Sequence, residues 1–489
     1  MNDKQYEILA LTLRYWFVLL IVYVFVKSTA RTFRDIFSDQ PVKRSTGNIP
    51  FVLVLFTLTA FGLLAMQGSQ AFNVDTALLG VLASAIVLFQ FYLLYYLFPG
   101  IDEILLLIIN TLAILGFIML QRLTPELALR QVQWFAVGCA VLFGTLLIMP
   151  RINSLKRFSS PLMILGPAVL FFVAFFGGES GGATSKLSFG SISVQPSEFV
   201  KVIFIMILAD SLKEVKTFRE KIPLFLFAAA SILGVVLQKD LGSALHYFIV
   251  FLFVYQISTN DWLITTVASG AGVLAAVAGY KIFPHVQVRV EAWKNPWADI
   301  GGKGWQVAQS LMAMGSGGLV GMGLGLGTPY VIPASRTDFI FAAICEEFGI
   351  LAGGIVIGFY VLVLIRSMYK ANLAQSPYDM LLACGSAISL AVQAFIIIGG
   401  VVKMIPLTGI TLPFISYGGS SMVTSFALLG LILSVSIKNE RLVKATDGYE
   451  YLDENQDSEQ EGFEDEENRE QELDDGGEMK SLYRDGRIR

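Results

Sequence analysis

Histidine, cysteine and charged side chains are scarce in this sequence. Of its 489 residues only 2 are His and 3 are Cys, and only 15% are charged, against about 25% in an ordinary soluble domain. Neither residue type shows metal-ligand spacing, and an odd number of cysteines offers no disulfide framework. We therefore interpret Cys139, Cys345, Cys384, His246 and His285 as structural residues. The composition argues against a soluble enzyme.

Apolar runs make up most of the chain instead. Hydrophobic residues account for 55% of it, and 37 residues are Phe. Because a helix needs about 20 apolar residues to cross a bilayer, the runs predict thirteen spans and an all-α polytopic membrane protein. The spans are expected at 8–27, 50–66, 77–98, 103–121, 134–150, 161–178, 197–212, 222–237, 241–258, 262–283, 337–365, 378–400 and 414–436. No cleavage site follows the first run, which we interpret as a true span rather than a removed signal peptide.

Lysine and arginine are concentrated in alternate loops. The segments 28–49 and 213–221 carry four each, whereas 67–76 carries none. Because cytoplasmic loops are enriched in these residues, the pattern predicts an N-terminus outside the cytoplasmic membrane and a C-terminus in the cytoplasm. Two long segments, 179–196 and 284–336, are then on the outer side. Functional side chains concentrate on loops held by a rigid scaffold, so we expect the site near 284–336.

The end of the chain differs in composition from the rest. Residues 447–489 contain 17 acidic and 5 basic residues, a net charge of −12, while the remainder, with 22 acidic and 30 basic residues, has +8. Such a segment buries too little apolar surface to order itself. We predict a disordered acidic cytoplasmic tail at 441–489.

Ionisable residues inside the apolar runs are few. Each costs about 2.5–3.5 kcal/mol at the centre of a spanning helix, so each is a functional candidate. Glu198 and Lys201 lie three residues apart and can pair on one helix face; they form either an ion pair that locks two helices or the wall of a charged cavity. Glu346 and Glu347 are adjacent and cannot both face one lumen, so at least one is expected to pair with a neighbouring helix.

Acidic and glycine residues mark the longest outer loop. Asn295-Pro296 predicts a turn that places Asp299 beside aromatic residues and the run Gly301–Gly304. An acid in such a position can act as a general base on a hydroxyl. The alternative is that Asp299 hydrogen-bonds the Gly-rich backbone and stabilises the turn. Further along, Met314–Gly327 lacks the Gly-Lys-Ser/Thr ending of a phosphate loop, so we reject nucleotide binding, expect no nucleic acid partner and predict an interfacial or re-entrant hairpin.

Six segments in order resemble one known family. They are Gln195–Lys201 (QPSEFVK), Lys239–Ala244 (KDLGSA), Asn295–Asp299 (NPWAD), Gln309–Gly318 (QSLMAMGSGG), Arg336–Gly349 (RTDFIFAAICEEFG) and Leu412–Ser421 (LPFISYGGSS). Together they resemble the SEDS proteins, the FtsW/RodA/SpoVE group, and are more similar to the FtsW and SpoVE branches. The resemblance covers residues 101–440 and implies a ten-helix core. Residues 1–100 would then form three extra transmembrane helices.

The resemblance implies a peptidoglycan glycosyltransferase that polymerises lipid II, an undecaprenyl-pyrophosphate-linked disaccharide peptide, at the outer membrane face. A class B penicillin-binding protein would crosslink the product, and membrane lipid surrounds both. By the same resemblance Asp299 is the base that deprotonates the acceptor 4-hydroxyl. The expected substrate-binding residues are Glu198, Lys201, Lys239, Asp240, Arg289, Gln309, Arg336, Asp338 and Ser416.

The sequence departs from the family pattern at three places. Thr184-Ser185-Lys186 stands where a basic residue and a Trp are usual, Ile300 replaces the Pro after the catalytic Asp, and Lys403 replaces a small residue. The sequence specifies no cofactor, and assistance by Mg²⁺ or Mn²⁺ stays open. Two alternatives to the transferase also stay open: a non-catalytic scaffold that activates a penicillin-binding protein, and a lipid II flippase.

Overall fold

The computed structural model describes residues 3–38, 47–67, 72–152, 154–155, 158–180, 183–190, 192–214 and 217–442. Its α-helices are α1 (Asp3–Phe37), α2 (Ile49–Ala65), α3 (Val74–Leu97), α4 (Glu103–Leu123), α5 (Pro125–Ile148), α6 (Ser159–Phe176), α7 (Pro196–Leu212), α8 (Phe218–Leu237), α9 (Leu241–Thr259), α10 (Trp262–Ile282), α11 (Pro284–Lys294), α12 (Trp305–Gly317), α13 (Ile340–Asn372), α14 (Pro377–Val401) and a last helix, Gly419–Leu442. Short 3-10 helices are η1 (Met149–Arg151), η2 (Pro296–Asp299) and η3 (Pro329–Val331), and the strands are β1 (Gly178–Ser180), β2 (Ala183–Phe189) and β3 (Ile192–Val194).

Each of the thirteen predicted spans overlaps one of these helices. Eleven helices of the described residues are long and apolar enough to cross a membrane. The other two, α2 and α7, have 17 residues each, and α7 is interrupted by charged side chains. The all-α polytopic architecture is thus confirmed, and the chain is a multi-pass membrane protein.

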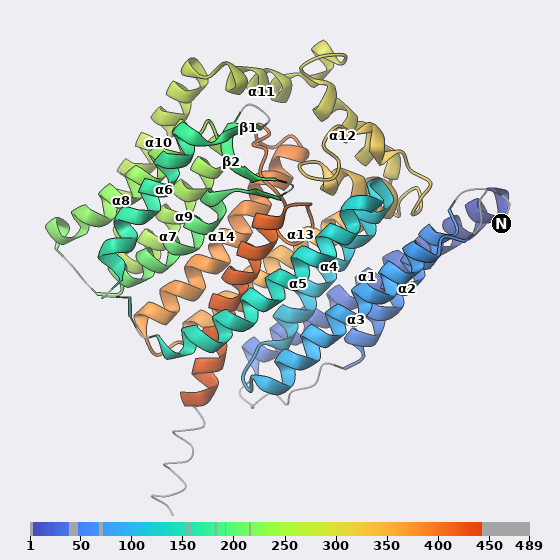
Figure 1. The fold of residues 1–489 in the computed structure, drawn as a ribbon, viewed down its shortest axis with the longest axis horizontal. Coiled ribbons are helices and arrows are strands. Elements are labelled where there is room, and N and C mark those ends of the chain that lie inside the picture. Colours follow the sequence, from blue (N-terminus) through green and yellow to red (C-terminus); the bar gives the residue numbers. More distant parts are fainter. Residues whose placement is uncertain are drawn as a thin grey trace, which may run out of the picture. The chain divides into compact units, whose positions relative to one another are not determined.

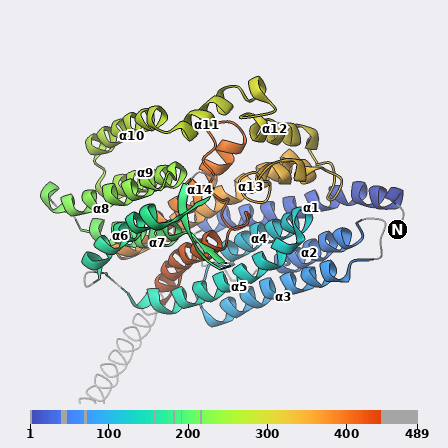
Figure 2. The same cartoon turned by 45° about the horizontal axis from the view of Figure 1, so that its top comes forward.

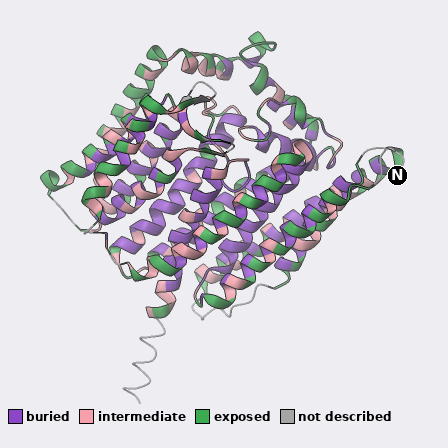
Figure 3. Cartoon of the chain, in the orientation of Figure 1, coloured by how far each residue is buried: buried purple, intermediate pink, exposed green. Residues whose placement is uncertain are grey.

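Within the unit Met1–Ile437, α13, α14 and the last helix lie in the centre, with α4 and α5 beside them (Figure 1). Helices α6 to α10 gather on one side and α1 to α3 on the other, which the turned view also shows (Figure 2). Buried residues concentrate on the central helices (Figure 3). Of the most apolar stretch of α4, 94% is buried inside the protein, whereas none of the corresponding stretch of α10 is buried. The exposed apolar faces of the peripheral helices are the surface that a bilayer would cover.

A small antiparallel sheet follows α6, and no pattern in the sequence predicted it. Its strand order is β1-β2-β3, with Gly178 opposite Lys186 and Leu187 opposite Val194. The amide of Thr184 donates to the carbonyl of Gln238 at 2.9 Å, which ties β2 to the turn between α8 and α9. The sheet thereby brings Lys186 to the end of the bundle at which α11 and α12 lie, called the loop end below.

Buried polar contacts join α1 and α3 to the central helices. Away from the loop end, Arg366 of α13 pairs with Asp102 at 2.6 Å and with Asp35 of α1 at 2.8 Å. Inside the apolar layer, Asn110 of α4 donates to Gln90 of α3 at 2.9 Å. An interhelical hydrogen bond of this kind contributes roughly 0.6–2 kcal/mol in a membrane.

Two predictions on domain organisation stay predictions. The proposed boundary between 1–100 and 101–440 falls inside the single unit Met1–Ile437, and a second unit comprises Lys438–Arg489. Residues 443–489, which make up nearly all of the predicted acidic tail, lie outside the described residues.

Candidate functional site

A cavity of about 820 Å³ lies at the loop end, and most of the predicted binding residues line it. Segments far apart in the sequence form its wall, from α5 to the start of the last helix. The charged residues of the lining are five basic and three acidic side chains: Arg130, Lys186, Lys239, Arg289, Arg336, Glu198, Asp240 and Asp338. This excess of positive charge suits an anionic ligand.

The turn between α8 and α9 is a fixed part of the wall. Lys239 adopts a left-handed φ of 59°, and Asp240 caps α9. Its Oδ1 accepts the amide N–H of Ser243 at 3.0 Å, while its Oδ2 accepts the Ser243 hydroxyl at 2.8 Å and the side-chain amide of Gln195 at 3.1 Å. Burial raises the pKa of Asp240, as does the nearby charge of Glu198, against the opposing effects of the Ser243 bonds and of Arg289.

Helix α11 carries Arg289 to the cavity and is fastened there. The guanidinium of Arg289 donates to the carbonyl of Thr408 at 2.8 Å, and the indole N–H of Trp293 donates to the carbonyl of Lys403 at 3.1 Å. A guanidinium has five N–H donors, so Arg289 keeps capacity for a ligand.

The segment before α13 supplies Arg336 and Asp338. The carbonyl of Arg336 accepts the amide N–H of Tyr417 at 3.0 Å. The Ser416 hydroxyl donates to the carbonyl of Thr337 at 2.6 Å and accepts the amide of Leu412 at 2.9 Å. Ser416 is buried and is not among the lining residues, so the structure makes it a support of the wall.

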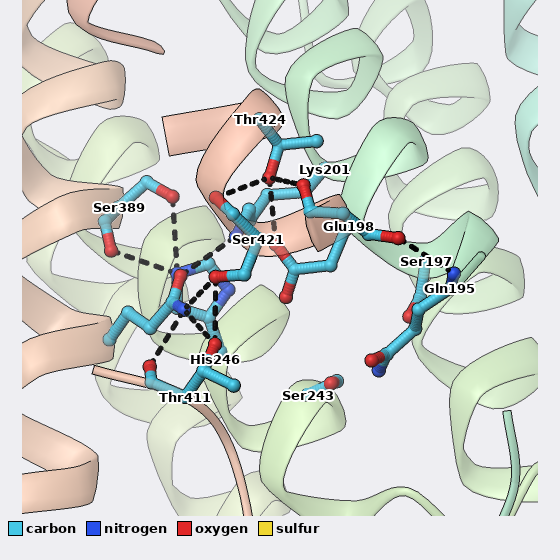
Figure 4. Close-up of polar contacts among 12 residues, drawn as sticks. Gln195, Ser197, Glu198, Lys201, Ser243, His246, Ser389, Thr411, Ser421 and Thr424 are labelled. Atoms are coloured by element: carbon cyan, nitrogen blue, oxygen red, sulfur yellow. Dashed lines mark hydrogen bonds and ion pairs between the residues drawn. The ribbon is translucent and has the colours of Figure 1, made fainter. Parts of the chain in front are cut away.

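Glu198 and Lys201 form a buried ion pair at 2.6 Å, with side chains 10% and 4% exposed (Figure 4). The Lys201 ammonium also donates to Gln393 of α14 at 2.7 Å, and the Thr424 hydroxyl of the last helix donates to Glu198 at 2.9 Å. Glu198 lines the cavity, whereas Lys201 does not. The pair therefore ties three helices together, and its Glu198 forms part of a charged wall.

Asp299 lies at the end of η2 with an exposed side chain, and it is not among the residues that line the cavity. Its Oδ2 accepts the amide of Lys303 at 3.0 Å, and its carbonyl accepts the amides of Gly302 and Gly304 at 3.2 and 3.0 Å. These are the bonds of the turn-stabilising interpretation, and the exposure leaves the carboxylate within reach of a substrate. Gln309, half-buried on α12, does not line the cavity either.

The comparisons with known proteins agree with this architecture. The family model described as "Cell cycle protein", which names FtsW, RodA and SpoVE, matches residues 93–441. The chain belongs to this family. Among its relatives, the peptidoglycan glycosyltransferase RodA of Mycobacterium tuberculosis is 33% identical over 374 residues, which cover 69% of this chain and 78% of that protein. A probable peptidoglycan glycosyltransferase FtsW of Geobacter metallireducens is 31% identical over 361 residues, covering 69% and 95%.

Solved structures also resemble this FtsW/RodA/SpoVE family member. A chain described under "Structural coordination of polymerization and crosslinking by a peptidoglycan synthase complex" has 25% identity and a TM-score of 0.59, covering 69% of this chain and 98% of that one. The rod shape determining protein RodA of Thermus thermophilus has 26% identity and a TM-score of 0.51, covering 69% and 96%.

Three residues of the site in this family member, Gln393, Thr424 and Arg130, were not predicted from the sequence. Gln393 was detectable as a lone amide in the apolar run 378–400, but Thr424 gave no signal. Arg130 was missed because the span was expected to begin at residue 134. Helix α5 begins at Pro125 instead and carries Arg130 one turn before Trp134, which also lines the cavity. In the described part of the chain, no group of three or more His, Cys, Asp or Glu side chains could hold a metal ion.

Proposed function

We propose that this protein is a peptidoglycan glycosyltransferase that polymerises lipid II at the outer face of the bacterial cytoplasmic membrane. The observation that carries the proposal is the cavity of about 820 Å³ with five basic lining residues, placed at the loop end of a multi-pass membrane protein. The relatives named peptidoglycan glycosyltransferase support it. The Lys and Arg pattern of the loops supports an N-terminus outside and a C-terminus in the cytoplasm.

The cavity suits the diphosphate of a lipid-linked sugar. Arg289, Arg336, Lys239 and Lys186 supply cations from four separate segments of its wall, and Arg is well suited to bidentate contact with phosphate. On α5, Val137 lines the cavity and is also 45% exposed on the surface of the helix. A ligand with its charged head in the cavity can thus keep its polyprenyl chain in the bilayer.

Asp299 is the proposed general base. The 4-hydroxyl of the acceptor sugar attacks the anomeric carbon of the donor, a new glycosidic bond forms, and the bond from that carbon to the diphosphate oxygen breaks. The Asp299 carboxylate takes the hydroxyl proton, and polyprenyl diphosphate leaves with the bonding electrons. The cations of the cavity stabilise the charge that develops on the leaving group.

Titration of Asp240 makes binding depend on pH. Its pKa is raised by burial, so as the pH falls it takes up a proton before exposed carboxyls do. The diphosphate of lipid II is esterified at both ends and keeps its charge as the wall carboxyl titrates. Losing one negative charge from the wall should therefore tighten binding about threefold to tenfold, because removing one repulsive charge beside an anion changes its binding free energy by about 1 kcal/mol.

Equilibrium binding of lipid II, measured at several pH values, tests this expectation. Asp240→Asn is the informative variant, because Asn still caps a helix but carries no charge. It should bind more tightly than the wild type at neutral pH and show a flatter pH profile. Equal pH profiles for the two proteins would exclude Asp240 as the titrating group.

Two other functions make different predictions. A flippase needs a polar route to the opposite face, but Arg366 near that face is held in ion pairs with the buried Asp102 and the partly buried Asp35, which favours the transferase. A scaffold would need only its surface to activate a class B penicillin-binding protein. We propose such a protein as the partner because a structural relative belongs to a complex that combines polymerisation with crosslinking.

The deciding experiment is polymerisation of lipid II by the purified protein, alone and with a class B penicillin-binding protein whose own transpeptidase site is blocked. We expect glycan strands from the wild type on a gel. If no polymer forms even with the partner, the transferase is excluded and the scaffold is favoured. Movement of fluorescent lipid II across vesicles without polymer would favour the flippase.

A further inference from the structure

The glycine run Gly318–Gly327, which follows α12, is inserted into a break in α13. Helix α13 loses its helical geometry at Gly349, with φ 89° and ψ 165°. The break frees carbonyls and amides of α13, and the run pairs with both kinds. The amides of Met322 and Gly323 donate to the carbonyls of Glu346 and Glu347 at 2.9 and 3.1 Å. In return, the amides of α13 just after the break donate to the carbonyls of Gly318 and Leu319.

Four other carbonyls of the run, those of Gly321, Leu324, Gly325 and Gly327, accept hydrogen bonds from side chains of other segments. Three of these side chains belong to the segment before the family match. The Tyr6 hydroxyl donates to Leu324 at 3.3 Å and Arg14 to Gly321 at 3.4 Å, both from α1, and Gln67 after α2 donates to Gly325 at 3.2 Å. We call Tyr6, Arg14 and Gln67 the clamp.

Arg122 of α4 completes the contacts. It donates to the carbonyls of Gly325 and Gly327 at 3.3 and 2.9 Å and pairs with Glu347 at 2.9 Å, as expected for one of the two adjacent glutamates. Glu346 accepts the amide of Thr328 at 2.7 Å. The run is therefore held on one face by the break in α13 and on the other by α1, Gln67 and α4.

The glycines are needed for this fit. Gly321, Gly323 and Gly325 have φ of 85°, 108° and 90°, which side chains rarely adopt. A Cβ at Gly325 would collide with the Tyr6 hydroxyl, and one at Gly321 with the carbonyl of Glu347. The close approach of α1 to the run thus depends on the absence of side chains there.

We propose that the clamp, acting through the glycine run and α12, positions the turn that carries Asp299. Tyr6, Arg14 and Gln67 are then positioning residues. The run continues α12, a helix of 13 residues whose other end is bonded through Gly304 to the carbonyl of Asp299. A short helix transmits a shift at one end to the other, so fixing the run fixes the Asp299 turn. The same run holds α13, which follows Arg336 and Asp338 of the cavity. The inference rests on the proposed function.

The test removes the donors of the clamp in the full-length protein in lipid nanodiscs. The triple variant Tyr6→Phe/Arg14→Met/Gln67→Met keeps the size of each side chain but loses the bonds. We expect amide hydrogen exchange in residues 318–328 to accelerate about tenfold. The turnover number for lipid II polymerisation should fall about tenfold to hundredfold, while KM changes by less than about threefold. Restoring a donor with Arg14→Lys in place of Arg14→Met should recover part of the protection from exchange and part of the turnover number.

Thr12→Val/Thr29→Val is the matched control, because both hydroxyls bond only to carbonyls of α1 itself. It should leave exchange and turnover unchanged. Unchanged exchange in the triple variant would refute the clamp, whatever the activity. Faster exchange with unchanged turnover would refute its positioning role. If the wild type makes no polymer but exchange is faster in the triple variant, the proposed function has failed and the positioning role fails with it. The contact between the clamp and the glycine run would still be supported.

Discussion

Replacing Asp299 by Asn should abolish glycan polymerisation and leave the fold intact. Asn cannot accept the hydroxyl proton, and loss of a general base lowers rates by about 10²–10⁴. The Asn side-chain oxygen can still accept the amide of Lys303, the bond that Asp299 makes through Oδ2 at 3.0 Å. Because the side chain is exposed, the free energy of unfolding should change by no more than about 0.5 kcal/mol.

The measurement is the initial rate of lipid II polymerisation in the complex with the penicillin-binding partner, beside thermal unfolding and partner binding of each protein. Glu291→Gln is the matched control. Glu291 is an exposed carboxylate on the preceding helix, paired with Lys303 at 2.9 Å, and its loss should leave the rate near that of the wild type. Equal rates for Asp299→Asn and the wild type would remove Asp299 from the mechanism and leave it the turn-stabilising role that its hydrogen bonds already show.

Replacing Lys201 by Met should strongly destabilise the protein. The change leaves Glu198 as a buried charge without its counter-ion, and breaking a buried pair in this way costs about 3–5 kcal/mol. The carboxylate would retain the Thr424 hydroxyl at 2.9 Å, but a single neutral donor does not replace an ammonium. The second variant, Glu198→Gln/Lys201→Met, removes both charges and should recover most of the lost stability.

Thermal unfolding in a mild detergent measures the effect, with Lys303→Met as the control. Lys303 and Glu291 form an ion pair of similar length, 2.9 Å, but with side chains 52% and 54% exposed, so its loss should cost no more than about 1 kcal/mol. If Lys201→Met is no more destabilising than Lys303→Met, the pair does not lock the helices. Polymerisation by the double variant then separates the two roles: a stable but inactive protein shows that the cavity needs the charges themselves.

Local patterns in the sequence determined the helices and one piece of the site. Thirteen apolar runs became thirteen helices because the length of a spanning segment is set by the bilayer rather than by distant contacts. The pairing of Glu198 with Lys201 followed from their spacing on one helix. The boundaries were less accurate. Helix α5 begins at Pro125 rather than at residue 134, because its first two turns include polar residues that hydropathy assigns to a loop.

Only the tertiary structure decided which motifs meet. Lys239, Arg289 and Arg336 lie on separate segments, and the cavity exists because α5, α7, α11, the turn before α9 and the segment before α13 converge at one end of the bundle. No local pattern encodes that convergence, which depends on helix packing between residues far apart in the chain. The same holds for the clamp. The glycines were visible in the sequence, but the collision that a Cβ at Gly325 would make is with Tyr6, 319 positions earlier in the chain.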